Sequence, residues 1–337
     1  MNPLDRWLAS MEGRELDRPP VCCMTTSANL DQMEAVGVYW PEAHSDPGLM
    51  TDLALAANRV VGFESVRIPF CLTVEAEILG AEVDLTKVDR NPMIKGHPFD
   101  EETVDQIEVP DDVMERGRAK VVKESTEILK ERVGGELPIV VGSTGPFTVA
   151  SHLVGAENLL LWIVTNPDAV HQALRGATEM VERFNRELDS LGVDAIQQSD
   201  PSASTDMLSG EMFDEFAAPY IRRSFEGVEN AKSVLHICGN TTPLLEHMIA
   251  TGVDGLSIEE KVDPQEAVDI VNGRAALVGN IGIVKPLLQG TPYEVREDTM
   301  RVCEAGFNVV NPGCGMAAKV PNENLRAMVE AVRSFGK

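Results

Sequence analysis

Short runs of apolar, mostly β-branched residues recur along the chain between longer segments that have the period of an amphipathic helix. Near-continuous apolar runs of this length are typical of parallel strands buried on both faces. Eight strands are predicted, at Pro20–Thr25, Glu64–Phe70, Pro138–Thr144, Val193–Asp200, Ser233–Asn240, Asp254–Glu260, Ala275–Ile281 and Phe307–Gly313. Helical patterns between them include Asp111–Arg132, Pro167–Leu191, Ser209–Asn230 and Pro292–Ala305. Eight alternations of strand and helix predict an α/β fold of the (β/α)8 TIM-barrel type.

Two segments depart from a minimal barrel. Residues 2–18 are predicted to form an N-terminal helical extension that caps the start of the barrel. The connection between the second and third strands, residues 71–137, is too long for a simple crossover. We interpret it as an elaborated insertion and expect residues 1–337 to form a single barrel domain.

The acidic composition narrows the range of partners. Against 29 basic residues stand 54 acidic ones, which gives a formal net charge of −25 at pH 7. Nucleic-acid binding is disfavoured, because it depends on neutralising phosphates with Lys and Arg. Two interpretations remain open, a strongly solvated surface without a specific partner and adaptation to a salty cytoplasm. No apolar run approaches the length of a membrane span and the N-terminus lacks a signal-peptide pattern, so a cytoplasmic protein without membrane partners is expected.

One pair of reactive side chains lies at the end of the fifth predicted strand. His236 and Cys238 are two residues apart, so in an extended strand both side chains point to the same side. This pair alone is weak evidence for a metal, because a buried cysteine is usually an inert small hydrophobe. Of the other cysteines, Cys22, Cys23, Cys71 and Cys303 are interpreted as packing residues.

A third soft ligand follows the eighth strand. Cys314 lies between two glycines in a loop expected at the same mouth of the barrel, where barrel enzymes carry their active sites. Together with His236 and Cys238 it makes three nitrogen and sulfur donors, the set that zinc prefers, with a fourth tetrahedral position left for a reactant. The fifth and eighth strands are not neighbours, so Cys314 must reach across the mouth.

Further polar residues end the remaining strands. Glu259 or Glu260, after the sixth strand, is a candidate fourth zinc ligand or a hydrogen-bond partner of a zinc ligand, with two solvated acids as the alternative. Asp200, after the fourth strand, is a candidate for binding a reactant or accepting a proton, but Asp-Pro-Ser is equally an ordinary turn. Asn280 closes the seventh strand, where barrel loops often bind anions such as a sulfonate or phosphate. Asn240 follows the His-x-Cys pair and is a further candidate for reactant binding.

With these residues in place, the chain resembles the methylcobamide:coenzyme M methyltransferases within the uroporphyrinogen decarboxylase superfamily. The His-x-Cys pair with the later cysteine is the zinc-ligand pattern of that family, and the similarity extends over nearly the whole chain. The matching segments are Tyr39–His44, Gly142–Pro146, His236–Asn240 and Asn311–Gly315.

The resemblance implies transfer of a methyl group from a methylated corrinoid to the thiol of coenzyme M. A separate corrinoid carrier protein would deliver the methyl group. Zinc on His236, Cys238 and Cys314 would bind the thiol and lower its pKa, and the resulting thiolate would attack the methyl carbon and leave cobalt as Co(I). In this interpretation Glu259, or failing that Glu260, is the zinc ligand that the thiol displaces.

Three alternatives remain open at this stage. A related enzyme with the same ligands would pass the methyl group to tetrahydrofolate or to another thiol. A decarboxylase of tetrapyrrole carboxylates would need cationic clamps and no metal, and the arginine-rich segment of those enzymes is absent after Val21. A catalytically idle module that binds a corrinoid protein would have no need of an open metal site.

Overall fold

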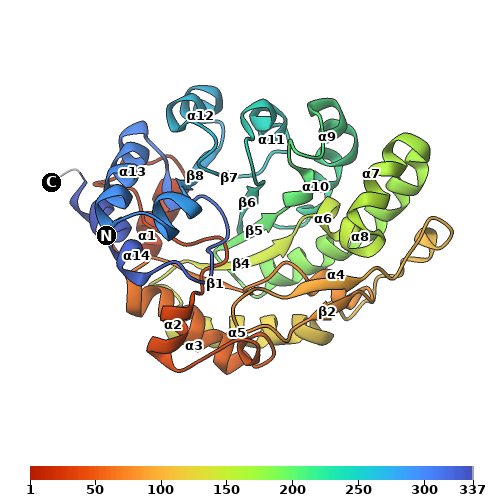
Figure 1. Cartoon of the computed structure of the whole chain (residues 1–337), viewed down its shortest axis with the longest axis horizontal. Coiled ribbons are helices and arrows are strands. Elements are labelled where there is room, and N and C mark those ends of the chain that lie inside the picture. The colour runs from red at the N-terminus through yellow and green to blue at the C-terminus, as the bar shows by residue number, and fades with distance from the viewer. Residues whose placement is uncertain (336–337) are drawn as a thin grey trace.

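The computed structural model describes residues 1–335 and is built around a parallel sheet with helices packed around it (Figure 1). The sheet has seven strands in the order β1-β4-β5-β6-β7-β8-β9. Almost every strand residue is buried, which explains why the strands appear in the sequence as continuous apolar runs. The strand bounds are β1 Val66–Ile68, β4 Ile139–Thr144, β5 Ala195–Ser199, β6 Lys232–His236, β7 Gly255–Ile258, β8 Ala276–Ile281 and β9 Val309–Pro312.

The first predicted strand is present only as an isolated bridge that joins the two edges of the sheet. Val21 pairs in parallel with Val310 of β9, and its carbonyl accepts a hydrogen bond from the backbone N–H of Glu64, before β1. The expectation of a full strand at Pro20–Thr25 was therefore wrong. The backbone N–H groups of Val21 and Cys23 donate to the side chains of Glu64 and Ser65 instead of to strand carbonyls.

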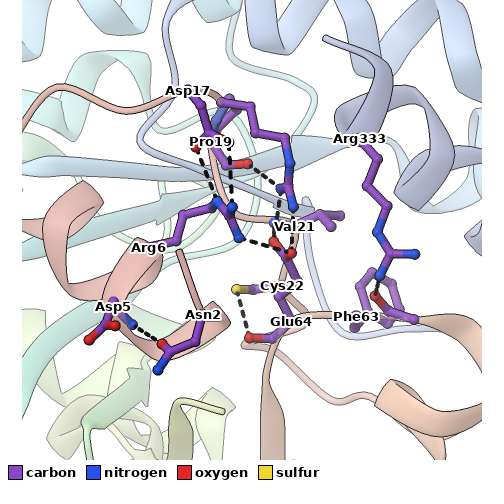
Figure 2. A network of polar contacts seen from close by, with 12 residues as sticks. Asn2, Asp5, Arg6, Asp17, Pro19, Val21, Cys22, Phe63, Glu64 and Arg333 are labelled. Atoms are coloured by element: carbon purple, nitrogen blue, oxygen red, sulfur yellow. Dashed lines mark hydrogen bonds and ion pairs between the residues drawn. The ribbon is translucent and has the colours of Figure 1, made fainter. Parts of the chain in front are cut away.

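A buried ion-pair cluster fixes this junction (Figure 2). The Glu64 carboxylate accepts two hydrogen bonds from the Arg18 guanidinium, at 2.6 and 3.0 Å, and one from Arg6 at 3.4 Å. Arg6 also pairs with the exposed carboxylate of Asp17. Because Arg6 belongs to the N-terminal helix and Glu64 precedes β1, the cluster ties the N-terminal segment to the closure of the sheet.

The N-terminal helix α1 covers the interior of the sheet at the end where the strands begin, which we call the lower end. It spans Pro3–Met11, capped by the Asn2 side chain, and is shorter than the predicted 2–18. Its Trp7 and Met11 pack on the first inward-facing residues of the strands, an apolar group we call the lower layer. The lower layer comprises Trp7, Met11, Cys22, Met24, Val140, Ala195, Val234, Ala276, Val278 and Val309.

The segment between β1 and β4 carries elements of its own. It holds the short helix α4 (Val74–Ile78), the antiparallel pair of β2 (Glu82–Asp84) and β3 (Met93–Gly96), and the helix α5 (Gly117–Val133). The start of α5 was expected near Asp111. Residues 113–115 instead form a single 3-10 turn, and α5 begins at Gly117, whose φ of 44° is left-handed.

The predicted helices are largely where the apolar period placed them. α8 (Pro167–Ser190) and α13 (Pro292–Ala305) agree with their expected bounds within one residue. The segment Ser209–Asn230 is instead two helices, α9 (Gly210–Phe216) and α10 (Ala218–Ser224). Ala217 leaves the helical region, and Pro219 at the start of α10 has no backbone N–H with which to continue α9. The other helices are α2 Leu30–Val36, α3 Pro47–Ala56, α6 Pro146–Val154, α7 Ala156–Thr165, α11 Leu245–Ile249, α12 Pro264–Val271 and α14 Asn322–Ser334.

Within residues 1–335, no single helix has both the length and the apolar character to cross a membrane. The bent pair α6 and α7 meets the test jointly, by length and composition only, with an angle of 101° between its halves.

Candidate metal centre

Three side chains from two distant parts of the chain converge at the carboxyl ends of the strands. The Cys238 sulfur lies 3.4 Å from Nε2 of His236 and 3.6 Å from the Cys314 sulfur. All three ligand atoms lie within 4.8 Å of one another. Among the described residues, this is the group of three or more His, Cys, Asp or Glu side chains that lie close enough together to share a metal ion. The expected convergence of His236, Cys238 and Cys314 is therefore found.

His236 is held in one orientation by the neighbouring strand. It ends β6 as the register partner of Ser257 of β7, and its Nδ1 lies 3.1 Å from both the carbonyl and the hydroxyl oxygen of Ser257. A proton on Nδ1 satisfies the carbonyl and leaves Nε2 with a free lone pair toward the two thiols. Burial, the largest single influence, works to lower the pKa of His236, but Cys314, the charge of Glu259 and the Ser257 carbonyl together outweigh it and the pKa is raised.

Cys238 reaches this group from a loop rather than from a strand. The prediction that the fifth strand extends to Asn240 was wrong, since β6 ends at His236 and Cys238 follows in irregular backbone. The two-residue spacing still places both side chains together, although not for the reason of strand alternation that predicted it.

Cys314 crosses the mouth on a loop that three contacts position. Its carbonyl accepts a hydrogen bond from the Thr25 hydroxyl at 2.7 Å, and Met316 N–H donates to Thr26. On the other side Gly313 N–H donates to Ile281 at 2.7 Å, and a methyl group on Gly313 would lie 3.0 Å from a Glu260 oxygen. Thr25 was not predicted to support the site, because its role depends on a contact between residues 289 positions apart in the chain.

The donor atoms fit a tetrahedral zinc ion. Zinc–sulfur bonds of about 2.3 Å and zinc–nitrogen bonds of about 2.05 Å at tetrahedral angles place sulfur roughly 3.8 Å from sulfur and roughly 3.6 Å from nitrogen. The observed separations are 3.6 and 3.4 Å. All six cysteines are free, so the close approach of the two sulfurs is not a disulfide. Hydrogen bonding to Cys238 and burial raise the pKa of the Cys314 thiol well above its ordinary value, and a divalent cation would reverse this by favouring the thiolate.

The two glutamates after β7 lie in different surroundings. Glu259 carries a charge that contributes to raising the pKa of His236, which places it on the side of the three-ligand group. Glu260 lies between the loops that follow β8 and β9, where one of its carboxylate oxygens has no hydrogen-bond partner among residues 1–335. Burial raises the pKa of Glu260. Neither carboxylate is part of the group within 4.8 Å, so a role as fourth ligand stays a prediction.

Asp200 is buried and occupied by protein donors. Its carboxylate accepts hydrogen bonds from the N–H groups of Phe147 and Thr148 and from the Thr148 hydroxyl, all in the first turn of α6. Burial raises the pKa of Asp200 to about 6. The structure thus gives this side chain a helix-capping position, and it leaves little capacity for the reactant binding considered from the sequence.

The two asparagines also have structural partners. Asn280 is buried, and its amide nitrogen donates to the carbonyls of Glu259 and Val262 at 3.1 and 2.8 Å. With both N–H groups used, only its acceptor oxygen remains, which is unsuited to an anion. Asn240 is exposed, and its side-chain oxygen accepts a hydrogen bond from Thr242 N–H. Asn280 therefore holds the loop that carries Glu259. For Asn240 the structure shows a local hydrogen bond and supports no role in reactant binding.

Comparison with known proteins places this geometry in a family. The model of the uroporphyrinogen decarboxylase (URO-D) family matches residues 2–335. A curated relative, methylcobamide:CoM methyltransferase MtaA of Methanosarcina barkeri, is 37% identical over 327 residues, covering 97% of this chain and 96% of that protein. The chain belongs to the methylcobamide:CoM methyltransferases of the URO-D family.

Two further comparisons agree with this placement. The methylated-thiol--coenzyme M methyltransferase of Methanosarcina mazei is 32% identical over 99% of this chain and 89% of its own length. A solved structure, a methyltransferase from Methanosarcina mazei, superimposes with a TM-score of 0.96 at 38% identity and covers 100% of both chains. The methyltransferase family predicted from the zinc-ligand pattern is thus confirmed.

Proposed function

We propose that this chain transfers a methyl group from a methylated corrinoid to the thiol of coenzyme M. The observation that carries the proposal is the convergence of His236, Cys238 and Cys314 at separations that suit zinc. The similarity to methyltransferases of the same name, over nearly the full length of both chains, supports the choice of donor and acceptor.

The three residues would hold zinc with one position open, and bound zinc would supply a Lewis acid that lowers the pKa of an incoming thiol. His236 contributes a neutral nitrogen that Ser257 keeps oriented toward the site. Cys238 and Cys314 contribute two negative charges as thiolates, which offset the charge of the cation. A thiol that loses its proton at such a site stays electron-rich and nucleophilic.

The transfer itself balances as a displacement at carbon. The thiol proton leaves to solvent, the sulfur forms a bond to the methyl carbon, and the cobalt–carbon bond breaks with its electron pair on cobalt. The chain provides positioning for this step rather than covalent chemistry of its own. A separate corrinoid carrier protein as the donor, and a cytoplasmic location, belong to the same proposal.

An assay with free methylcobalamin tests the proposal without the carrier. Zinc-loaded protein is incubated with methylcobalamin and coenzyme M, and the loss of the cobalt–methyl absorbance is followed together with the loss of free thiol. We expect both to disappear in equal amounts. Tetrahydrofolate and neutral thiols serve as alternative acceptors. Methylation of tetrahydrofolate but not of coenzyme M would assign a different acceptor, and no demethylation with any acceptor would contradict the proposal.

A further inference from the structure

The sheet interior contains a buried arginine that the metal centre does not explain. Arg67 is the middle residue of β1 and is 1% exposed. It pairs in register with Val140 of the lower layer, so its side chain leaves the sheet on the same, inward side. A buried cation inside a barrel is costly unless it is paired with an anion.

Within residues 1–335, Arg67 has no carboxylate at ion-pair distance. Its Nη1 donates to the backbone carbonyl of Pro69, and its Nε is buried without a hydrogen-bond partner. The nearby carboxylate of Glu75 is engaged with the N–H and hydroxyl of Thr144. Burial lowers the pKa of Arg67 to about 10, so the neighbouring charges do not compensate for its desolvation, yet the side chain stays cationic at pH 7.

The chain makes room for this guanidinium. A methyl group on Gly142 of β4 would overlap the end of the Arg67 side chain, so the guanidinium occupies space that the missing side chain of Gly142 leaves open. Gln197 of β5 is the register partner of Gly142, and its side-chain oxygen is also buried without a partner. Rotation of this amide by 180° would present an N–H group instead, with the oxygen accepting from Ser199.

These unpaired groups lie in the same sheet interior as the metal centre, with Gly142 two strands and Gln197 one strand from His236. Thr144 lies two residues after Gly142 on β4. In the sheet register Thr144 pairs with Ser199 of β5, and Ser199 pairs with His236 of β6, so these three residues form one row. The guanidinium therefore lies one inward-facing position below the row that contains His236. Burial raises the pKa of the nearby Cys23 thiol to about 12, so this thiol stays neutral and supplies no anion for Arg67. The Cys23 sulfur contacts Thr25 and Thr26, which support the Cys314 loop.

We propose that Arg67 is the anion-binding residue that recognises the charged end of the thiol substrate, with Gln197 as a second contact. The substrate class is then a short thiol whose far end carries a sulfonate or a similar oxyanion. This rests on the proposed function, because the sulfur is taken to lie at the three-ligand group. Arg67, rather than the loop of Asn280 expected from the sequence, carries the donors that such an anion needs.

Matched thiols test the inference. With methylcobalamin as donor, coenzyme M (2-mercaptoethanesulfonate) is compared with 2-mercaptoethanol, which has the same carbon chain and no charge. We expect Arg67→Gln to lower kcat/KM for coenzyme M roughly 10- to 100-fold, the size of a lost hydrogen bond to a charged group. The value for 2-mercaptoethanol should change much less, and Arg67→Lys should be intermediate. Equal losses for both thiols, or no preference for the sulfonate in the native protein, would overturn the assignment.

Arg118 provides the matched control, since it is also buried but already bonded to Glu77, Cys71 and Thr73. Any loss in Arg118→Gln should fall equally on the two thiols. If the preference for sulfonate is lost in this variant and kept in Arg67→Gln, the anion site is at Arg118 and the inference is wrong.

Two measurements separate this inference from the proposed function. In calorimetry, ethanesulfonate, which has no thiol, should bind the native protein but not the Arg67→Gln variant. The neutral analogue ethanesulfonamide should not bind the native protein. If ethanesulfonate binds but no methyl transfer occurs, the anion site at Arg67 is supported and the proposed function is contradicted. Removal of an unpaired buried charge should also leave the ligand-free protein at least as stable as the native one in thermal melting. Unfolding of both Arg67→Gln and Arg67→Lys would mean that the guanidinium is structural.

Discussion

At the scale of single residues, the metal centre combines one imidazole and two thiols whose positions are fixed by different neighbours. Ser257 orients His236, and Thr25 holds the Cys314 loop. Because zinc in such a site depends on each ligand, removal of either sulfur should weaken binding strongly.

We expect about one zinc per chain in the native protein and a loss of most of it in Cys238→Ala and Cys314→Ala. Elemental analysis after dialysis against a weak chelator measures the occupancy. Cys303→Ala is the control, because Cys303 is buried on α13 outside the three-ligand group and should keep its zinc. Full occupancy in both ligand variants would show that the metal, if any, binds elsewhere.

Glu259 is expected to be the zinc ligand that an incoming thiol displaces, so that coordination stays at four. Glu259→Gln should retain most of its zinc but change the affinity for the thiol and the pH dependence of thiol binding. X-ray absorption at the zinc edge, with and without coenzyme M, should show one oxygen replaced by sulfur in the native protein. Glu260→Gln is the paired control and should keep the exchange. An oxygen ligand that persists after thiol binding would refute the exchange but not the three-ligand site.

At the scale of elements, the closure of the sheet depends on side chains as much as on backbone pairing. The segment around Val21 offers one bridge to β9, and the Glu64 carboxylate takes the N–H that a longer strand would have paired. Burial alone would raise the pKa of Glu64, but the hydrogen bond and charge of Arg18 hold it below its ordinary value.

Glu64→Gln should destabilise the protein by about 3 kcal/mol at pH 7, because two buried guanidinium groups lose their common anion. Urea unfolding monitored by circular dichroism measures this. In the native protein the lowered pKa means that the stabilisation is complete above the unfolded value of about 4.3 and is lost as the pH falls through the folded value. The variant should lack this part of the pH dependence.

Asp17→Asn is the control, since it removes the other partner of Arg6 at a carboxylate that is 66% exposed. Such a pair is expected to contribute less than about 1 kcal/mol. If the two variants lose equal stability, the ion pair of Glu64 is not the feature that holds the junction.

At the scale of the whole molecule, a net charge of −25 means that repulsion between like charges destabilises the folded state. Salt screens such repulsion over about 10 Å at 0.1 M and about 3 Å at 1 M. The melting temperature should therefore rise between 0.05 and 1 M potassium chloride by more than it rises in sucrose of equal osmolality. A melting temperature that falls as potassium chloride is added would mean that surface ion pairs such as Arg274 with Glu246 outweigh the repulsion.

The sequence by itself determined the elements whose signals are local. The apolar runs located the buried strands, and α13 was predicted to the residue because its ends are marked by the capping box of Thr291 with Glu294 and by Gly306 at φ 98°. The three candidate ligands were also found from the chain, since soft donors at strand ends are few and the barrel topology brings those ends together.

The tertiary structure alone decided features that depend on contacts between distant segments. Side chains from later in the chain satisfy the N–H groups that would have extended the first strand, so no local signal marks its reduction to a bridge. Asp200 was a candidate for reactant binding until its donors in α6 were known. Arg67 was overlooked because a single arginine inside an apolar strand has meaning only once its burial and its lack of a partner are known. The sequence records which donors are present, whereas the fold determines which of them are left unpaired.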